Sequence, residues 1–266
     1  MKFLVLFTFF LNSFALPISS VVVEEETQYR WPVLVSQPAI KLLGETCYES
    51  LLENFEWTNV SCLKLALSKI LGLGIVVGGA IVKIPQIVTI IKDGSAQGLS
   101  LASFVMETSA YEIILMYNTR LNNPFSTYGE VLFMSFQNII ISLLIPYYHS
   151  QKKTMCGLLA YFLLGFVLLE MIPAWLMSLL YALQIPIGLA SKIPQIRTNY
   201  MNQSTGQLSV FAVLNYFVGT TARAFTTWTE LDDPVMLGGN LLASILNGIL
   251  VFQLIWYWKT PLAKAD

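Results

Sequence analysis

The sequence predicts an all-α integral membrane protein with seven transmembrane helices in a parallel 3+1+3 repeat of two triple-helix bundles. Apolar residues make up 55% of the 266 positions and charged residues 12%, about half the roughly 25% typical of soluble domains. Apolar segments of bilayer length recur along the chain. A five-residue sequence also occurs twice in the chain, which indicates an internal duplication.

The N-terminus, residues 1–20, has the pattern of a signal peptide. Lys2 precedes an apolar run from Phe3 to Leu16, which is shorter than the ~20 residues needed to cross a bilayer. The small residues Ser13 and Ala15 suggest cleavage after Ala15, and the alternative is an uncleaved signal anchor. Cleavage would place the polar segment 21–62 in the lumen of the secretory pathway.

Two of the three cysteines fall in this lumenal segment. Cys47 and Cys62 would therefore meet an oxidising compartment, where a disulfide between them can persist. Cys156 lies in an apolar segment and is expected to be a small packed residue. Because cysteine count alone fixes no pairing, the Cys47–Cys62 disulfide is an expectation from topology.

Seven apolar segments of bilayer length follow. The fourth and fifth meet at Met171, Ile172 and Pro173 with almost no polar break, but together they are too long for one crossing and count as two. The segments are 66–91, 101–118, 128–148, 155–172, 174–196, 208–226 and 235–258.

Basic residues in the short loops predict the orientation, because they favour the cytosolic side. A lumenal N-terminus gives the cytosolic loops and the tail 259–266 most of these residues, whereas the lumenal loops after the first span hold Arg120. The signal peptide and the charge bias agree on a cytosolic C-terminus. The cytosolic basic residues are Lys92, Lys152, Lys153, Arg197, Lys259 and Lys264.

An internal repeat organises the spans. Residues 83–87, Lys-Ile-Pro-Gln-Ile, recur as residues 192–196, and the same offset of 109 carries Gly79 onto Gly188 and Asn138 onto Asn247. The repeats are residues 63–148 and 174–258, with three helices each. A linker helix, 149–173, restores the orientation between them, so the two copies insert in parallel.

The duplicated Pro-Gln resembles the PQ-loop superfamily, which includes SWEET sugar transporters, cystinosin-type transporters and the KDEL receptor. Within it, the segments 71–76, 98–101, 123–130 and 205–209 resemble the mannose-P-dolichol utilization defect protein family. The resemblance implies a SWEET-like fold in the endoplasmic reticulum membrane. It also implies a requirement for dolichyl-phosphate-mannose and dolichyl-phosphate-glucose in N-glycosylation and GPI anchor biosynthesis. The implied partners are membrane lipid, the lipid-linked sugar and lumenal glycosyltransferases.

Binding, presenting or moving the lipid-linked sugar are all compatible with this resemblance. One alternative is a SWEET-like or cystinosin-like transporter of small solutes, although the PQ motifs here lack the acidic residues of proton-coupled members. Another is a chaperone without transport activity.

Several other classes of function are disfavoured by the sequence. The net charge of −1 gives no basic excess for nucleic acid. The acidic loop around Glu230, Asp232 and Asp233 is too short for a glycosyltransferase site. His149 is the only histidine, so we expect no enzyme, no metal site and no cofactor.

The PQ motifs supply the first candidate site residues, Pro85 with Gln86 and Pro194 with Gln195. A proline inside a helix frees a backbone carbonyl and kinks the helix, and in membrane proteins such kinks can form a hinge or line a cavity. We expect the two glutamines to supply the missing hydrogen bonds. A purely structural kink is the alternative.

Polar residues inside the spans supply the remaining ligand-binding candidates. Asn138 and Asn247 resemble the sugar-contacting positions of SWEET transporters, with interhelical hydrogen bonding as the alternative. Lys83 is expected to pair with Glu107. Its counterpart Lys192 has Tyr216 at the position equivalent to Glu107, so it lacks this partner and could bind a phosphate head group or snorkel to the interface. Glu112 and Arg223 are expected to pair with each other.

Overall fold

A computed structural model of the protein describes residues 29–190, 192–205 and 210–257. The predicted signal peptide, 1–20, and the predicted tail, 259–266, lie outside the described residues. The chain divides into two compact units, Met1–Asn54 and Phe55–Asp266.

The first unit is a small helical cluster in its described part. It comprises α2 (Val33–Leu43), α3 (Glu45–Tyr48) and a π-helical turn η1 (Glu49–Glu53). Tyr48 is completely buried, packs edge-on against Tyr29 and donates a 2.7 Å hydrogen bond to Glu53 Oε1. These contacts tie the end of the cluster back to its beginning.

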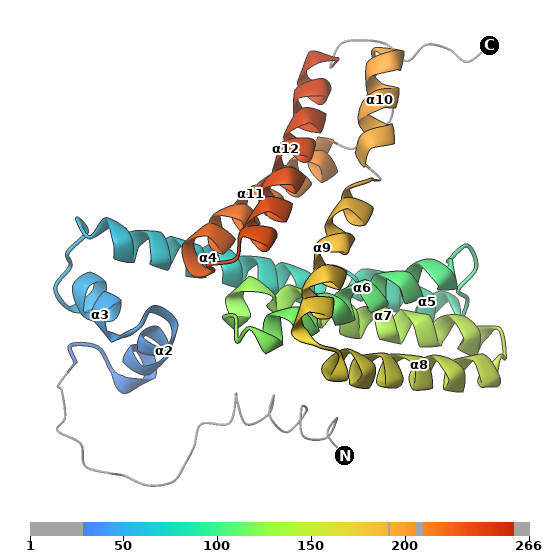
Figure 1. Ribbon diagram of the computed structural model, residues 1–266, viewed down its shortest axis with the longest axis horizontal. Helices are drawn as coiled ribbons and strands as arrows, with labels where there is room; N and C mark the ends of the chain where they lie inside the picture. Colours follow the sequence, from blue (N-terminus) through green and yellow to red (C-terminus); the bar gives the residue numbers. More distant parts are fainter. Residues whose placement is uncertain (1–28, 191, 206–209, 258–266) are drawn as a thin grey trace, which may run out of the picture. The chain divides into compact units, whose positions relative to one another are not determined.

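The second unit contains the helices of both predicted repeats, and every regular element described in it is helical (Figure 1). The first repeat covers α4 (Val60–Ile81), α5 (Ile84–Asp93), α6 (Leu101–Arg120), the 3-10 turn η2 (Phe125–Thr127) and α7 (Gly129–Tyr148). After α8 (Lys152–Met171), the second repeat covers α9 (Ala174–Ala190), α10 (Lys192–Asn202), α11 (Val210–Glu230) and α12 (Pro234–Trp256).

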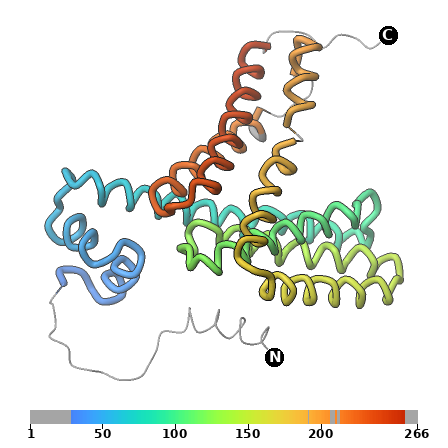
Figure 2. The backbone as a smooth tube through the Cα atoms, viewed as in Figure 1, coloured from blue at the N-terminus to red at the C-terminus, as the bar shows by residue number. Residues whose placement is uncertain are grey.

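The first helix of each repeat packs against a helix of the other repeat. Helices α6, α7 and α8 pack together, and α11 packs along α12 (Figure 2). Helix α4 of the first repeat also packs on α11 of the second, and α9 of the second packs on α6 of the first. Each repeat therefore contributes one helix to the surface of the other.

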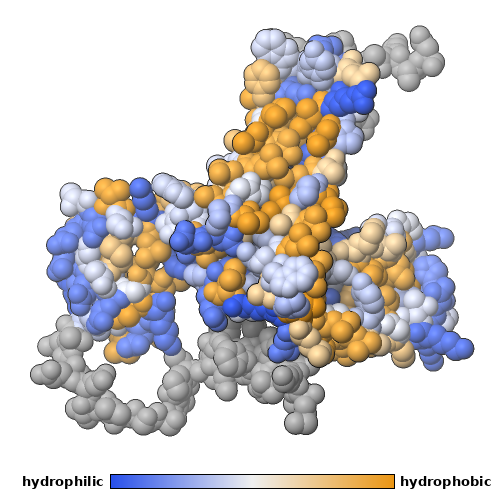
Figure 3. All heavy atoms as spheres, in the orientation of Figure 1, coloured by the Kyte–Doolittle hydropathy of each residue, from blue (hydrophilic) through white to orange (hydrophobic). Residues whose placement is uncertain are grey.

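Five helical segments are long and apolar enough to cross a membrane in the part of the chain described. Apolar side chains such as Leu241, Ile245 and Phe252 are exposed on α12, where Figure 3 shows an apolar surface. Lipid would cover such a surface, and the chain is a multi-pass membrane protein. The five segments are Val60–Asp93, Gly129–Tyr148, Lys152–Met171, Ala174–Asn202 and Pro234–Trp256.

The second and sixth predicted crossings, α6 and α11, are not among these five. Their polarity explains this: α6 carries Glu107, Glu112 and Arg120, and α11 carries Arg223 and Glu230. Most of these side chains contact other helices rather than lipid, as described below. Seven crossings and the 3+1+3 arrangement therefore remain predictions.

The first PQ motif marks a helix break rather than the predicted kink within one helix. Helix α4 ends at Ile81, and α5 begins at Ile84 with Pro85 in its first turn. There a proline costs no hydrogen bond, because the first amides of a helix have no partner within it. Pro194 similarly lies in the first turn of α10.

Gln137 of α7, rather than the predicted Gln86, satisfies the backbone at this break. Its Nε2 donates to the carbonyls of Gly79 at 2.8 Å and Ala80 at 3.2 Å, and its Oε1 accepts from the Lys83 amide at 2.9 Å. The prediction failed because the freed groups point toward a neighbouring helix, which a residue adjacent to the proline cannot reach. Gln137 also holds α7 against the end of α4.

Candidate functional site

A polar network lies at the centre of the first repeat. Lys83 Nζ is 2.7 Å from Glu107 Oε2, as predicted, and donates a 2.6 Å hydrogen bond to Asn138 Oδ1. The Asn138 amide donates to the same carboxylate at 2.9 Å, and Tyr111 donates to its other oxygen at 2.6 Å. Both polar ends of the buried Asn138 side chain are thus occupied within the protein.

Among the described residues, the equivalent positions of the second repeat form no such network. Lys192 Nζ lies 4.5 Å above the ring centre of Tyr216, which replaces Glu107, so a cation–π contact stands where the first repeat has an ion pair. Asn247 is buried and donates to Thr220 Oγ1 at 3.3 Å. The two asparagines predicted as a pair therefore have different partners.

The predicted pairing of Glu112 with Arg223 is wrong. Arg223 Nη2 instead lies 2.5 Å from Glu130 Oε1, and its Nη1 donates to the Ser126 carbonyl at 3.0 Å. Glu112 is buried and faces α8, where its Oε2 would lie 3.0 Å from a Cβ added to Gly165. Similar depth in the membrane suggested the pair, but depth does not determine which helix face a side chain occupies.

A second ionic cluster links the first repeat to α11. Lys69 Nζ lies 2.6 Å from Glu230 Oε2, and Ser68 donates to Glu230 Oε1 at 2.6 Å. Ser126 of η2 donates to the same carboxylate at 2.9 Å. Sequence reasoning missed Lys69 as a site residue, although a lysine within the first predicted span is the kind of residue that needs a partner.

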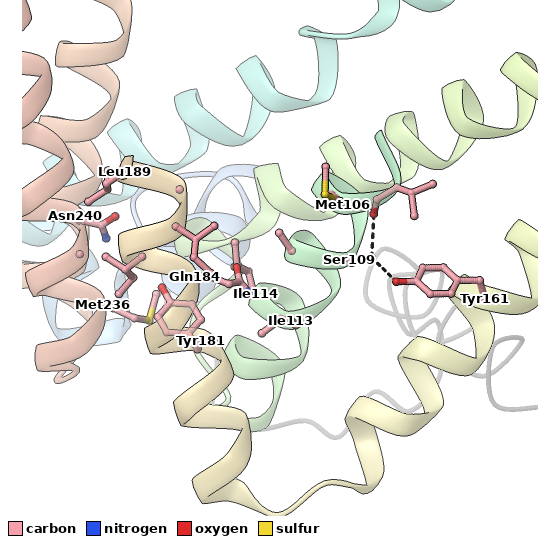
Figure 4. A pocket seen from close by; sticks show the side chains of 16 residues that line it. Met106, Ser109, Ile113, Ile114, Tyr161, Tyr181, Gln184, Leu189, Met236 and Asn240 are labelled. Atoms are coloured by element: carbon pink, nitrogen blue, oxygen red, sulfur yellow. Dashed lines mark hydrogen bonds between the residues drawn. The ribbon is translucent and has the colours of Figure 1, made fainter. Parts of the chain in front are cut away.

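A pocket of about 600 Å³ lies between the two repeats. Its walls come from α6, α8, α9 and α12 (Figure 4). Most lining side chains are apolar, and the polar exceptions are few, as is typical of ligand pockets. The lining includes Met106, Ser109, Ile113, Ile114, Tyr161, Tyr181, Gln184, Ile185, Met236 and Asn240.

Four side chains that bring hydrogen-bonding groups to this pocket are Ser109, Tyr161, Asn240 and Gln184. The Ser109 and Tyr161 hydroxyls are 3.0 Å apart, and the Asn240 amide donates to Thr227 Oγ1 at 2.9 Å. The Gln184 Nε2 atom is buried and has no hydrogen-bond partner among the described residues. An unpaired buried amide costs about 1–3 kcal/mol, so a ligand acceptor would be favoured there.

Sequence reasoning did not find the pocket residues. Neither Asn138 nor Asn247 lines the pocket, nor do the two PQ pairs. A comparison of the two repeats could have pointed to them, because the offset of 109 aligns Gln184 with Ile75 and Asn240 with Val131. The first repeat has aliphatic side chains at these two positions, so the shared fold does not require an amide there.

Metal chemistry receives no support in the described residues, which contain no group of three or more His, Cys, Asp or Glu side chains able to hold an ion. Cys156 is free. The disulfide between Cys47 and Cys62 stays a prediction.

Comparison with known proteins agrees with the repeat. The family model of the PQ loop repeat matches residues 67–127 and 176–236. The two matched segments are displaced by 109 residues, which is the offset found from the sequence itself. The chain therefore carries two PQ loop repeats in a multi-pass membrane protein.

The chain is also similar to a human protein, solute carrier family 66 member 3. The two are 26% identical over 189 residues, which span 70% of this chain and 92% of the human protein.

Proposed function

We propose that the protein enables the use of dolichyl-phosphate-mannose and dolichyl-phosphate-glucose in the endoplasmic reticulum, by binding and presenting or moving the lipid-linked sugar in the pocket between its repeats. Its N-terminus would lie in the lumen and its C-terminus in the cytosol. The protein itself would carry out no glycosyl transfer, and the lumenal glycosyltransferases would be its partners.

The observation that carries the proposal is the mixed character of this pocket. Its largely apolar walls suit the first part of a polyisoprenyl chain, and the hydroxyl and amide groups of Ser109, Tyr161 and Gln184 suit sugar hydroxyls. A soluble monosaccharide would leave much of the apolar wall exposed to water. The motifs shared with the mannose-P-dolichol utilization defect protein family point to the same ligand.

We propose that the helix break at the first PQ motif acts as a hinge. Only Val82 and Lys83 separate α4 from α5, and Gln137 and the Lys83 network hold this junction. We propose that Pro85 and Pro194 allow the helices to swing at these junctions as the pocket opens. Lys192, which has Tyr216 in place of an acidic partner, would make a transient contact with the donor phosphate, whereas Lys83 is engaged by Glu107 and Asn138.

A second function, transport of a small solute, is favoured by the similarity to human solute carrier family 66 member 3. The two functions differ in the ligand they require. Purified protein in liposomes would take up a labelled free hexose if it were a solute transporter, whereas it would act only on the lipid-linked sugar in the favoured case.

The experiment that tests the proposed function is the analysis of lipid-linked oligosaccharides in cells lacking the protein. We expect truncated species that lack the mannose and glucose residues added in the lumen, and full-length species after re-expression. Full-length oligosaccharides in the deficient cells, with both donors present at normal levels, would refute the proposal.

A further inference from the structure

From the geometry of the pocket we infer that the sugar is recognised by the second repeat through the Gln184 amide, with Tyr181 and Asn240 beside it, and not by the asparagine pair Asn138 and Asn247. The inference rests on the proposed function and names the subsite within the same pocket. Its ligand class is a hydroxyl-bearing hexose attached to a lipid phosphate.

The first argument is that the asparagine pair is already engaged and lies elsewhere. Asn138 has no exposed surface, accepts from Lys83 and donates to Glu107. Asn247 donates to Thr220, and neither asparagine lines the pocket. Contact with a sugar would require Asn138 to break an internal network of charged hydrogen bonds.

The second argument is the state of the Gln184 side chain. Figure 4 shows Gln184 extending from α9 beside Ile114, with Tyr181 one turn earlier on the same helix and Asn240 on α12. Its Nε2 atom is buried without a hydrogen-bond partner among the described residues. Because a buried amide donor without an acceptor is unfavourable, this atom is suited to a ligand oxygen.

The third argument comes from the duplication, which provides an internal control. The first repeat carries Ile75 and Val131 at the positions of Gln184 and Asn240, and Gly72 at that of Tyr181. The same helical repeat therefore folds without polar groups at these positions. The fold already uses two of these side chains, because Tyr181 stacks on Tyr117 and Asn240 donates to Thr227. Gln184 Nε2 has no hydrogen-bond partner among the described residues, so it is the group that a ligand would explain.

The test compares two probes binding to the purified full-length protein in lipid nanodiscs. One probe is citronellyl phosphate carrying mannose, and the other is citronellyl phosphate without the sugar. The variant is Gln184→Leu, with Gln184→Met as a second variant of similar length if the leucine protein is poorly folded. The control is Gln97→Leu, which changes an exposed glutamine outside the pocket.

We expect the unmodified protein to prefer the mannosylated probe, and Gln184→Leu to lose about tenfold in affinity for it, which corresponds to one buried hydrogen bond. Affinity for the sugar-free probe should stay the same. The melting temperature of ligand-free Gln184→Leu should be unchanged or raised, because an unpaired amide has been removed. A merely structural glutamine would instead give a lower melting temperature and unchanged probe selectivity.

Two results would overturn the inference, and they are distinguishable from failure of the proposed function. Equal mannose preference in Gln184→Leu and the unmodified protein would remove Gln184 from the subsite while leaving donor binding intact. Equal affinity of the unmodified protein for both probes would show that no sugar is recognised. Binding of neither probe would refute the proposed function itself.

Discussion

The two PQ loop repeats have the same helical plan but place their polar residues differently. The first uses Lys69, Lys83, Glu130 and Gln137 to hold helices together, whereas the equivalent positions of the second are Ser178, Lys192, Gly239 and Leu246. Polar side chains at the pocket wall come from both repeats, Ser109 from the first and Gln184 and Asn240 from the second. Under the proposed function, the first copy mainly braces the helices, and the second contributes Gln184, whose Nε2 atom has no hydrogen-bond partner among the described residues.

The largest expected effect comes from opening the ion pair that joins the first repeat to α11. Glu230→Gln leaves the Lys69 ammonium without its carboxylate, and both side chains are nearly buried. We expect a loss of about 3 kcal/mol in stability, measured by unfolding in mixed micelles, and no such loss for the exposed Asp232→Asn. Wild-type stability in Glu230→Gln would show that the first repeat is not braced by this pair.

The second-largest difference in stability is expected at a glycine that both repeats have at the same position. A Cβ at Gly79 would lie 2.5 Å from Glu130 Cβ and 2.9 Å from its Cα, whereas a Cβ at Gly188 meets no atom within 4 Å. Gly79→Ala should cost about 1–3 kcal/mol, and Gly188→Ala should gain up to about 1 kcal/mol from helix propensity. Melting temperatures of the ligand-free variants check this, and equal shifts would contradict the asymmetry.

The helix break should be sensitive to Gln137 and insensitive to Gln86. Gln137→Leu introduces the residue type that the second repeat has at position 246, but it removes the acceptor for the Lys83 amide and the donor for the Gly79 carbonyl. We expect a loss of about 2 kcal/mol and faster hydrogen exchange at residues 79–83. Gln86→Leu is the matched control. A larger loss of stability in Gln86→Leu than in Gln137→Leu would support the expectation that Gln86 supplies the hydrogen bonds at the break.

The smallest expected difference in stability is between losing the partner of Lys83 and losing the partner of Lys192, the two lysines of the PQ motifs. Glu107→Gln should cost about 1–2 kcal/mol, less than a fully buried pair because the Glu107 side chain is 37% exposed. Tyr216→Leu removes only the cation–π contact of Lys192 and should cost less than about 1 kcal/mol. Chemical unfolding of the two variants side by side tests the order, and a reversed order would contradict it.

The sequence predicted the elements well where a pattern repeated. The offset of 109 predicted the duplicated architecture, whereas Pro85 marks a helix break in place of the predicted kink within one helix. The Lys83–Glu107 pair was also predictable, because the two charges fall at similar depth on neighbouring spans. The sequence predicted seven crossings, and five helical segments of the described residues are long and apolar enough to cross a membrane. The other two predicted crossings, α6 and α11, are not among these five because they carry more polar residues.

The candidate site was much less predictable. The partner of Arg223 depends on the rotation of α11 about its own axis, and the role of Gln137 depends on the distance between α4 and α7. Neither quantity can be obtained from depth in the membrane. In the sequence, Gln184 is an ordinary polar residue in an apolar segment, and only the structure shows that it lines the pocket and that its Nε2 atom has no hydrogen-bond partner among the described residues.

The central claim, that a lipid-linked sugar binds between the repeats, is tested most directly by photolabelling. A short-chain polyprenyl phosphate mannose with a photoreactive group would be bound to the protein in nanodiscs, and the labelled peptides identified by mass spectrometry. We predict labels on α6, α9 and α12 around Ile114, Gln184 and Asn240, competed by unlabelled donor. Labelling confined to α5 and α10, or insensitive to competition, would contradict the claim.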